Sequence, residues 1–141
     1  MNTENMTGLS GSTCEESRKH LLLVDDDPLY LKMVRGWLEG KYTITAVKSG
    51  AQALAYLKAH VADLILLDSE MPEMNGLEVF ERLKDDPGLS AIPVMFLTGK
   101  SEAEAKAMYS LTKQPPEGIL SKALERDGIE AAIDAYFASH M

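Results

Sequence analysis

The chain of 141 residues is long enough for one domain with its own hydrophobic core. Its formal net charge of -8 argues against a general affinity for nucleic acid or for anionic membrane surfaces. Its one cysteine, Cys14, excludes an internal disulfide framework and favours a reducing, cytoplasmic location. No apolar run approaches the roughly 18 residues that a membrane-spanning helix needs.

The N-terminal segment from Met1 to Ser17 is rich in Asn, Thr, Ser and Gly. It lacks the basic stretch followed by an apolar stretch that marks a secretory signal. Polar segments of this composition bury too little apolar surface to fold by themselves. We therefore expect a disordered tail over residues 1–19 and one folded domain over residues 20–139.

Strand-like and helix-like patterns alternate from His20 onward. Short apolar or alternating runs, which are typical of strands in a parallel sheet, occupy residues 21–24, 42–47, 64–67, 92–97 and 118–121. Segments with helical spacing or helix-forming composition follow them in turn, at residues 28–38, 51–60, 77–84, 101–111 and in a last helix with Ile129, Ile133, Tyr136 and Phe137 on one face.

This alternation predicts an α/β fold built on a doubly wound, five-stranded parallel sheet. In the common strand order 2-1-3-4-5, the first and third strands are neighbours at the point where the winding reverses. Ligands bind at that point, beyond the carboxyl ends of the strands. The fold therefore predicts where a functional site lies.

Five polar side chains come at the carboxyl ends of predicted strands. Asp25 and Asp26 follow the first strand, and Asp68 follows the third. Thr98 ends the fourth strand and Lys122 follows the fifth. A single aspartate in such a place most often caps the following helix. Capping does not explain five such side chains at four strand ends, so we expect these side chains to converge on one site.

The predicted cluster has the parts that phosphoryl transfer needs. Three carboxylates in one crevice repel each other unless a cation joins them, and oxygen ligands with room for water suit Mg2+. A carboxylate can also act as a nucleophile and form an aspartyl phosphate. Lys122 can supply a cation and Thr98 a hydroxyl to the phosphoryl oxygens. For Thr98, a local hydrogen bond to the backbone is the competing interpretation.

The motifs that carry a family resemblance are Leu22–Pro28 (LLVDDDP), Leu66–Gly76 (LLDSEMPEMNG), Phe96–Gly99 (FLTG) and Leu120–Lys122 (LSK). In this order they resemble the receiver domains of bacterial two-component response regulators, which include the chemotaxis receivers. The resemblance covers about residues 20 to 139 and implies the flavodoxin-like receiver fold. It implies a phosphorylation-switched signalling domain and not an enzyme.

By this resemblance Asp68 is the phosphoacceptor, and Asp25 and Asp26 hold Mg2+ together with Asp68 and the backbone carbonyl of Glu70. Thr98 and Lys122 would contact the phosphoryl group, as their positions already suggest. The implied donor is a phosphohistidine on a sensor histidine kinase or a histidine phosphotransfer protein.

The implied output surface comprises the 101–111 helix, the 118–121 strand and the last helix, with an unknown partner. A homodimer is one form that the resemblance allows. No effector domain follows residue 139, so we expect DNA binding and catalytic output to lie outside this sequence. A free-standing receiver and a piece of a longer regulator both remain open.

The sequence departs from the family pattern near the fifth strand. Ala123 stands where a proline usually follows the lysine, so we expect either a trans bond or a strained one. Ile119 stands three residues before the lysine, where family members commonly have an aromatic residue that moves together with the threonine. Tyr109 is a substitute to consider for this aromatic residue. Two prolines lie in the unusual stretch Thr112–Glu117. We therefore expect phosphate capture to be intact and its readout to be altered.

Glu70 and Lys100 lie two residues beyond Asp68 and Thr98, respectively. One hypothesis is that they pair across the entrance and hinder the water that hydrolyses the phosphoryl group. The alternative is two solvated side chains, worth less than about 1 kcal/mol as a pair.

Two rival functions remain. A phosphatase or phosphotransferase of the haloacid dehalogenase type would use Asp68 as nucleophile but needs a second acid and a substrate cap. A phosphate-independent interaction module would keep only the receiver shape. The Gly99-Lys100-Ser101 segment resembles the end of a nucleotide-binding loop, but Val94 stands where its first glycine is required.

Overall fold

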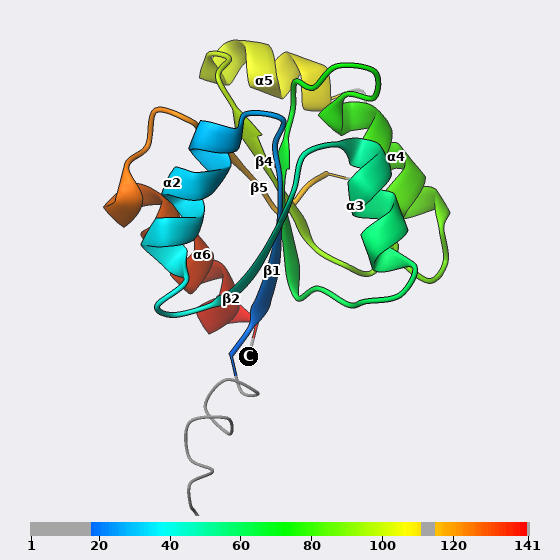
Figure 1. Ribbon diagram of the computed structural model, residues 1–141. Helices are drawn as coiled ribbons and strands as arrows, with labels where there is room; N and C mark the ends of the chain where they lie inside the picture. The colour runs from blue at the N-terminus through cyan, green and yellow to red at the C-terminus, as the bar shows by residue number, and fades with distance from the viewer. Residues whose placement is uncertain (1–17, 111–114, 141) are drawn as a thin grey trace, which may run out of the picture.

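The computed structural model describes residues 18–110 and 115–140. A parallel sheet runs through it in the order β2-β1-β3-β4-β5 (Figure 1). The strands are β1 (His20–Val24), β2 (Thr43–Val47), β3 (Leu64–Asp68), β4 (Val94–Thr98) and β5 (Gly118–Ser121). The helices are α2 (Pro28–Leu38), α3 (Gly50–Leu57), α4 (Gly76–Asp85), α5 (Glu102–Tyr109) and α6 (Arg126–Ser139). The predicted fold class and strand order are confirmed.

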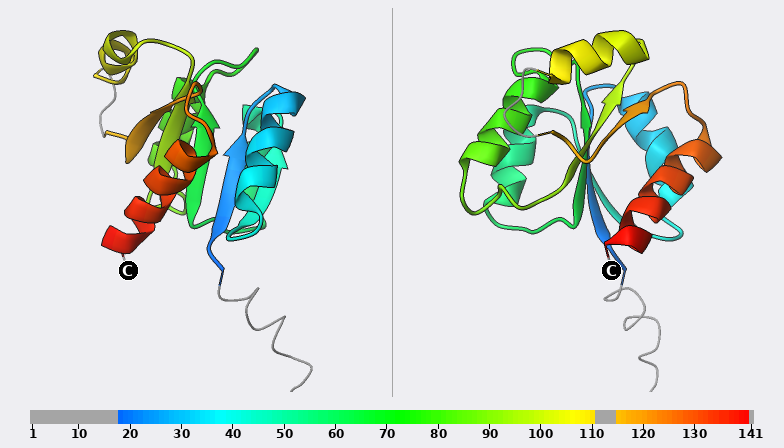
Figure 2. Two further views of the ribbon diagram at one scale, coloured as in Figure 1. Left: turned by 90° about the vertical axis from the view of Figure 1, so that its left-hand side faces the viewer. Right: turned by 180° about the vertical axis from the view of Figure 1, so that it is seen from behind.

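The helices form two layers, one on each face of the sheet. Helices α2 and α6 cover one face, and α3, α4 and α5 lie on the side of the other (Figures 1 and 2). The carboxyl ends of the strands are uppermost in these views, and the C-terminus lies at the opposite end. The site predicted from the strand ends therefore lies far from the C-terminus of the described chain.

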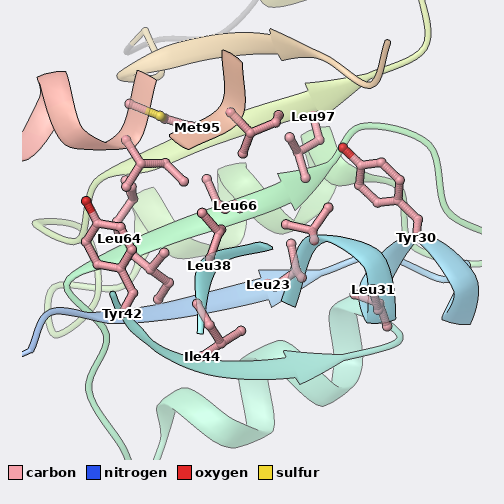
Figure 3. Close-up of a cluster of buried hydrophobic side chains, with 14 residues drawn as sticks. Leu23, Tyr30, Leu31, Leu38, Tyr42, Ile44, Leu64, Leu66, Met95 and Leu97 are labelled. Carbon is pink, nitrogen blue, oxygen red and sulfur yellow. The ribbon is translucent and has the colours of Figure 1, made fainter. Parts of the chain in front are cut away.

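The apolar runs are continuous because the sheet is covered on both faces. Along β1, Leu21 and Leu23 pack on the α2 and α6 side, whereas Leu22 and Val24 pack on the α3 and α4 side. Figure 3 shows the first of these clusters. Each fully buried leucine contributes about 2 kcal/mol of hydrophobic stabilisation.

Helix starts are fixed by side chains that lie next to the predicted site. The Asp27 carboxylate accepts a hydrogen bond of 2.9 Å from the backbone N–H of Leu29, at the beginning of α2. The Asn75 side chain accepts one of 2.9 Å from Glu78 at the beginning of α4. These caps satisfy backbone donors that a helix leaves free, and so they hold the loops around the site.

Several predicted boundaries shift by two or three residues. Strand β4 begins at Val94 and not at Ile92, because the Ile92 N–H bonds to Leu89 in a turn and Pro93 has no N–H to donate to a neighbouring strand. Helix α3 ends at Leu57, before the predicted His60. The disordered tail stays a prediction, since residues 1–17, including Cys14, lie outside the described residues.

Candidate functional site

Strand pairing brings the five predicted site residues to one edge of the sheet. Strand β1 pairs with β3, β3 with β4, and β4 with β5. Asp68 is paired with Leu97, and Thr98 with Ser121, one residue before Lys122. The predicted convergence of strand ends is therefore present in the structure.

Lys122 connects the two buried aspartates of the site. Its Nζ lies 2.7 Å from Oδ2 of Asp25 and 3.1 Å from Oδ1 of Asp68. Asp25 is 0% exposed and Asp68 only 2%, so neither carboxylate can rely on bulk water for its stabilisation. The second oxygen of Asp25, Oδ1, accepts a hydrogen bond of 2.9 Å from the backbone N–H of Asp27.

The electrostatic environment favours the protonated form of Asp68. Burial raises the pKa of Asp68 to about 6, and the nearby Asp25 carboxylate contributes to this rise. The backbone N–H of Glu70, which donates to Asp68 Oδ1 at 3.1 Å, and the Lys122 ammonium work in the opposite direction. Burial disfavours the Lys122 ammonium, but its two carboxylate partners outweigh this and raise its pKa. The site therefore has more negative charge than one lysine compensates.

The residues at this edge fit a hard divalent cation. One carboxylate oxygen from each of Asp25, Asp26 and Asp68 lies within 4.8 Å of the others. Asp68 Oδ2 is buried and has no hydrogen-bond partner among the described residues. Asp26 is exposed, so the group opens to water on one side. An oxygen-only ligand set with access to water is what Mg2+ prefers.

Thr98 is buried at 2% exposure, and its hydroxyl oxygen accepts a hydrogen bond of 3.0 Å from the backbone N–H of Lys100. This is the local hydrogen bond to the backbone that the sequence offered as the alternative to a contact with a phosphoryl group. A cavity of about 370 Å³ lies beside it, with Ser101, Ala105 and Ile119 among its lining residues. Ile119, at the position of the usual aromatic switch, is thus half-buried at the edge of an open space.

The other departures from the family pattern resolve in part. The structure has no cis peptide bond among its described residues, so the bond between Lys122 and Ala123 is trans. The Ala123 N–H is bonded to the Ser121 hydroxyl at 3.0 Å. The Tyr109 side chain and residues 111–114 lie outside what the structure describes. The proposed substitution of Tyr109 for the aromatic switch therefore stays a hypothesis.

Glu70 and Lys100 form the ion pair that the sequence suggested. Lys100 Nζ lies 2.8 Å from Glu70 Oε2, and this contact raises the pKa of Lys100. The Glu70 side chain is 58% exposed, so the ion pair lies at the surface. The Glu70 carboxylate is thus paired with Lys100 and not with the buried groups of the site. The backbone N–H of Glu70 donates a hydrogen bond to the Asp68 carboxylate. The metal-binding role of the Glu70 carbonyl stays a prediction.

Neither the contact of Tyr30 with the site nor the close packing at Gly76 was predicted from the sequence. The ring centroid of Tyr30 lies 4.9 Å from Lys122 Nζ. The only sequence signal was its position three residues beyond Asp27, on the helix that begins at the site. Gly76 lies so close to Asp68 that an added Cβ would overlap the Asp68 carbonyl oxygen and come within 2.8 Å of the Ser69 Cα. Gly76 thus permits α4 to pack against the backbone of Asp68.

Comparison with known proteins agrees with this geometry. The family model of the response regulator receiver domain matches residues 21–134. The chain is 36% identical over 118 residues to the transcriptional regulatory protein GlrR of Escherichia coli, covering 82% of this chain and 25% of that protein. It is 41% identical over 81 residues to the polar-differentiation response regulator DivK of Brucella ovis, covering 57% of this chain and 66% of DivK.

Solved structures with a similar fold include further response regulators. The chemotaxis response regulator CheY4 of Vibrio cholerae superposes with a TM-score of 0.76 at 23% identity, covering 84% of this chain and 98% of CheY4. The bacteriophytochrome response regulator RtBRR superposes with a TM-score of 0.73 at 32% identity, covering 83% of this chain and 76% of RtBRR. The fold and the site define a receiver-type signalling domain. The chain belongs to the response regulator receiver domain family.

The relatives' further activities do not transfer with the match. A probable cyclic di-GMP phosphodiesterase of Vibrio cholerae is 45% identical over 84 residues, which are 60% of this chain but 19% of that protein. The chain thus spans a quarter or less of the length of this relative and of GlrR. Within the described part, no helix combines the length and the apolar composition that crossing a membrane requires.

Proposed function

We propose that the domain accepts a phosphoryl group on Asp68, with Mg2+ bound at the acidic edge, from a phosphohistidine of a sensor kinase or phosphotransfer protein. An Asp68 carboxylate oxygen forms a bond to phosphorus while the donor's N–P bond breaks, and the electron pair of that bond returns to the imidazole nitrogen. The reaction is stoichiometric, and the product is an aspartyl phosphate. The domain spans residues 20–139 in this proposal.

One observation carries the proposal: the buried Asp68 carboxylate has one oxygen on Lys122 and a second oxygen that no described group satisfies. Asp25, Asp26, Asp68 and the Glu70 carbonyl would hold the metal ion. When bound, Mg2+ would neutralise charge on the carboxylates and on the phosphoryl oxygens. Lys122 would pair with a phosphoryl oxygen, since it already lies 3.1 Å from the acceptor carboxylate.

The Thr98 hydroxyl has a specific task in this proposal. It would exchange its bond from the Lys100 N–H for a bond to a phosphoryl oxygen. The cavity beside Thr98 gives the surrounding side chains room to follow this change. The movement would then reach the surface formed by α5, β5 and α6, where we place the output partner.

A phosphate-independent interaction module is the second candidate, and Ile119 is the observation that favours it. An isoleucine cannot reproduce the swing of an aromatic ring into the cavity beside Thr98. The enzymatic alternative finds less support, because the Glu70 carboxylate that could serve as its second acid is paired with Lys100.

Labelling with a small phosphodonor separates these candidates. Wild type and Asp68→Asn would be incubated with radioactive acetyl phosphate, with Mg2+ or with EDTA. We expect incorporation of at most one phosphoryl group per chain, only in wild type and only with Mg2+. No incorporation by folded wild type with Mg2+ would favour the interaction module. Continuous turnover of an external phosphomonoester would favour the enzyme.

A further inference from the structure

Tyr30 lies on the first turn of α2, immediately after the loop that carries Asp25 and Asp26. Its side chain is only 8% exposed and packs within the buried cluster that covers one face of the sheet. Figure 3 shows its ring reaching from α2 toward the carboxyl ends of the strands, with the hydroxyl on the side of Leu97. The ring therefore reaches the candidate site from the core.

The Lys122 ammonium is close both to this ring and to the two buried carboxylates. It is 4.9 Å from the Tyr30 ring centroid, 2.7 Å from Asp25 Oδ2 and 3.1 Å from Asp68 Oδ1. An ammonium at this distance from an aromatic face is attracted to it, most strongly where water is partly excluded. The Lys122 side chain is 26% exposed, so the contact is partly shielded from solvent.

The strand that carries Lys122 does little to fix its long side chain. Strand β5 lies at the edge of the sheet, and its four residues are half-buried or exposed. Residues 123–127, which follow Lys122, are all exposed. A lysine side chain on such a segment samples many rotamers unless other elements hold it. The contacts that hold its ammonium come from the ends of β1 and β3 and from α2.

The ring of Tyr30, and not its hydroxyl, makes the contact with Lys122. The Tyr30 hydroxyl is buried and has no hydrogen-bond partner in the described part of the chain. Burial raises the pKa of Tyr30 to about 12, so the ring stays neutral and keeps its electron-rich face. An aliphatic residue would fill the same space in the core but would offer the Lys122 ammonium no aromatic face.

We propose that Tyr30 is a positioning residue for phosphorylation, whose ring holds the Lys122 ammonium in place over the acidic edge. The proposal rests on the proposed phosphorylation of Asp68. When a phosphoryl group arrives on Asp68, Lys122 exchanges its contact with the Asp68 carboxylate for one with a phosphoryl oxygen. The contact with the ring does not involve the acceptor, so it keeps the ammonium near the reacting oxygen during this exchange.

The test compares phosphorylation rates from acetyl phosphate with Mg2+ for several variants. Tyr30→Phe keeps the ring, whereas Tyr30→Leu and Tyr30→Met remove it and retain an apolar side chain. Tyr42→Leu is the matched control, because Tyr42 is 6% exposed in the same cluster but its hydroxyl bonds to Asp134 on α6. Thermal unfolding shows which variants are folded at the assay temperature.

We expect the two aliphatic variants at position 30 to be phosphorylated roughly three- to tenfold more slowly than wild type, which is the range of a partly shielded cation–π contact. Tyr30→Phe should restore most of the rate, and the folded Tyr42→Leu control should keep it. In a Lys122→Ala background, Tyr30→Leu should cause no further loss, because the ring acts through the lysine. The proposal would be overturned if Tyr30→Leu slowed phosphorylation equally with Lys122 present and with Lys122→Ala. It would also be overturned if Tyr30→Leu alone left the rate unchanged.

A second readout does not depend on phosphorylation. The ε-methylene protons of Lys122 should show an upfield ring-current shift by NMR that Tyr30→Phe keeps and Tyr30→Leu loses. If folded wild type takes no label, the proposed function fails while this shift still tests the contact. If the shift is absent in wild type, the proposal for Tyr30 fails even where labelling succeeds.

Discussion

Replacing Asp68 by asparagine should stabilise the metal-free protein at neutral pH. Burial raises the pKa of Asp68 from 3.8 to about 6, so the folded chain binds a proton there more tightly than the unfolded chain does. Between these two values stability falls as pH rises, and the full cost is present above the folded-state pKa. The asparagine side chain of the variant would carry no charge to bury and would avoid this cost.

The pKa shift sets the size of the effect. A difference of roughly 2 pKa units corresponds to about 3 kcal/mol of unfolding free energy at pH 7.5. At pH 4.5 Asp68 is largely protonated in the folded state, and linkage reduces the difference to about 1 kcal/mol. Bound Mg2+ stabilises the charged carboxylate, so saturating Mg2+ should stabilise wild type more than the variant.

Urea unfolding of both proteins at the two pH values, in EDTA and then in Mg2+, provides the measurement. Asp85→Asn is the matched control, because it removes the same charge from an exposed position on α4. The control should change stability by less than about 0.5 kcal/mol at either pH. The reasoning fails if Asp68→Asn is no more stable than wild type at pH 7.5, or if acidification leaves the gap unchanged.

Three further predictions follow from single contacts. Lys100→Ala and Glu70→Ala each remove the surface ion pair, and either change should shorten the lifetime of the aspartyl phosphate by up to about fivefold. Unchanged dephosphorylation rates would contradict the hypothesis that the pair hinders hydrolysis. Asp26→Asn should weaken Mg2+ binding roughly tenfold by calorimetry without changing the unfolding midpoint by much, since Asp26 is exposed. Gly76→Ala should cost about 2–4 kcal/mol in urea unfolding, because its Cβ would overlap the Asp68 backbone; an unchanged midpoint would contradict the close packing.

The strand order and the meeting of Asp25, Asp68 and Lys122 were predictable because both follow from chain topology. Continuous apolar runs such as Leu64–Leu67 mark strands buried on both faces, and parallel strands bring their carboxyl ends together. The pairing of Glu70 with Lys100 was also predictable, since each lies two residues beyond a strand-end side chain. These features depend on the backbone path, which hydrophobic periodicity encodes.

Other features depend on side-chain geometry that periodicity does not encode. The apolar spacing of α2 marks Leu31, Val34 and Leu38 as core, but it does not show that the neighbouring Tyr30 ring lies under Lys122. The Thr98 hydroxyl had two plausible partners, and only the structure shows it bonded to the Lys100 N–H. The trans bond before Ala123 likewise came from the structure, because the sequence allowed two outcomes.

The most direct test of phosphorylation at Asp68 is to map the modified residue. Wild type would be treated with acetyl phosphate and Mg2+, and the acyl phosphate would then be reduced with borohydride, which converts a phosphorylated aspartate to homoserine. Peptide mass spectrometry should find homoserine at position 68 and aspartate at positions 25 and 26. Homoserine at another position, or none in folded protein, would contradict the proposed function.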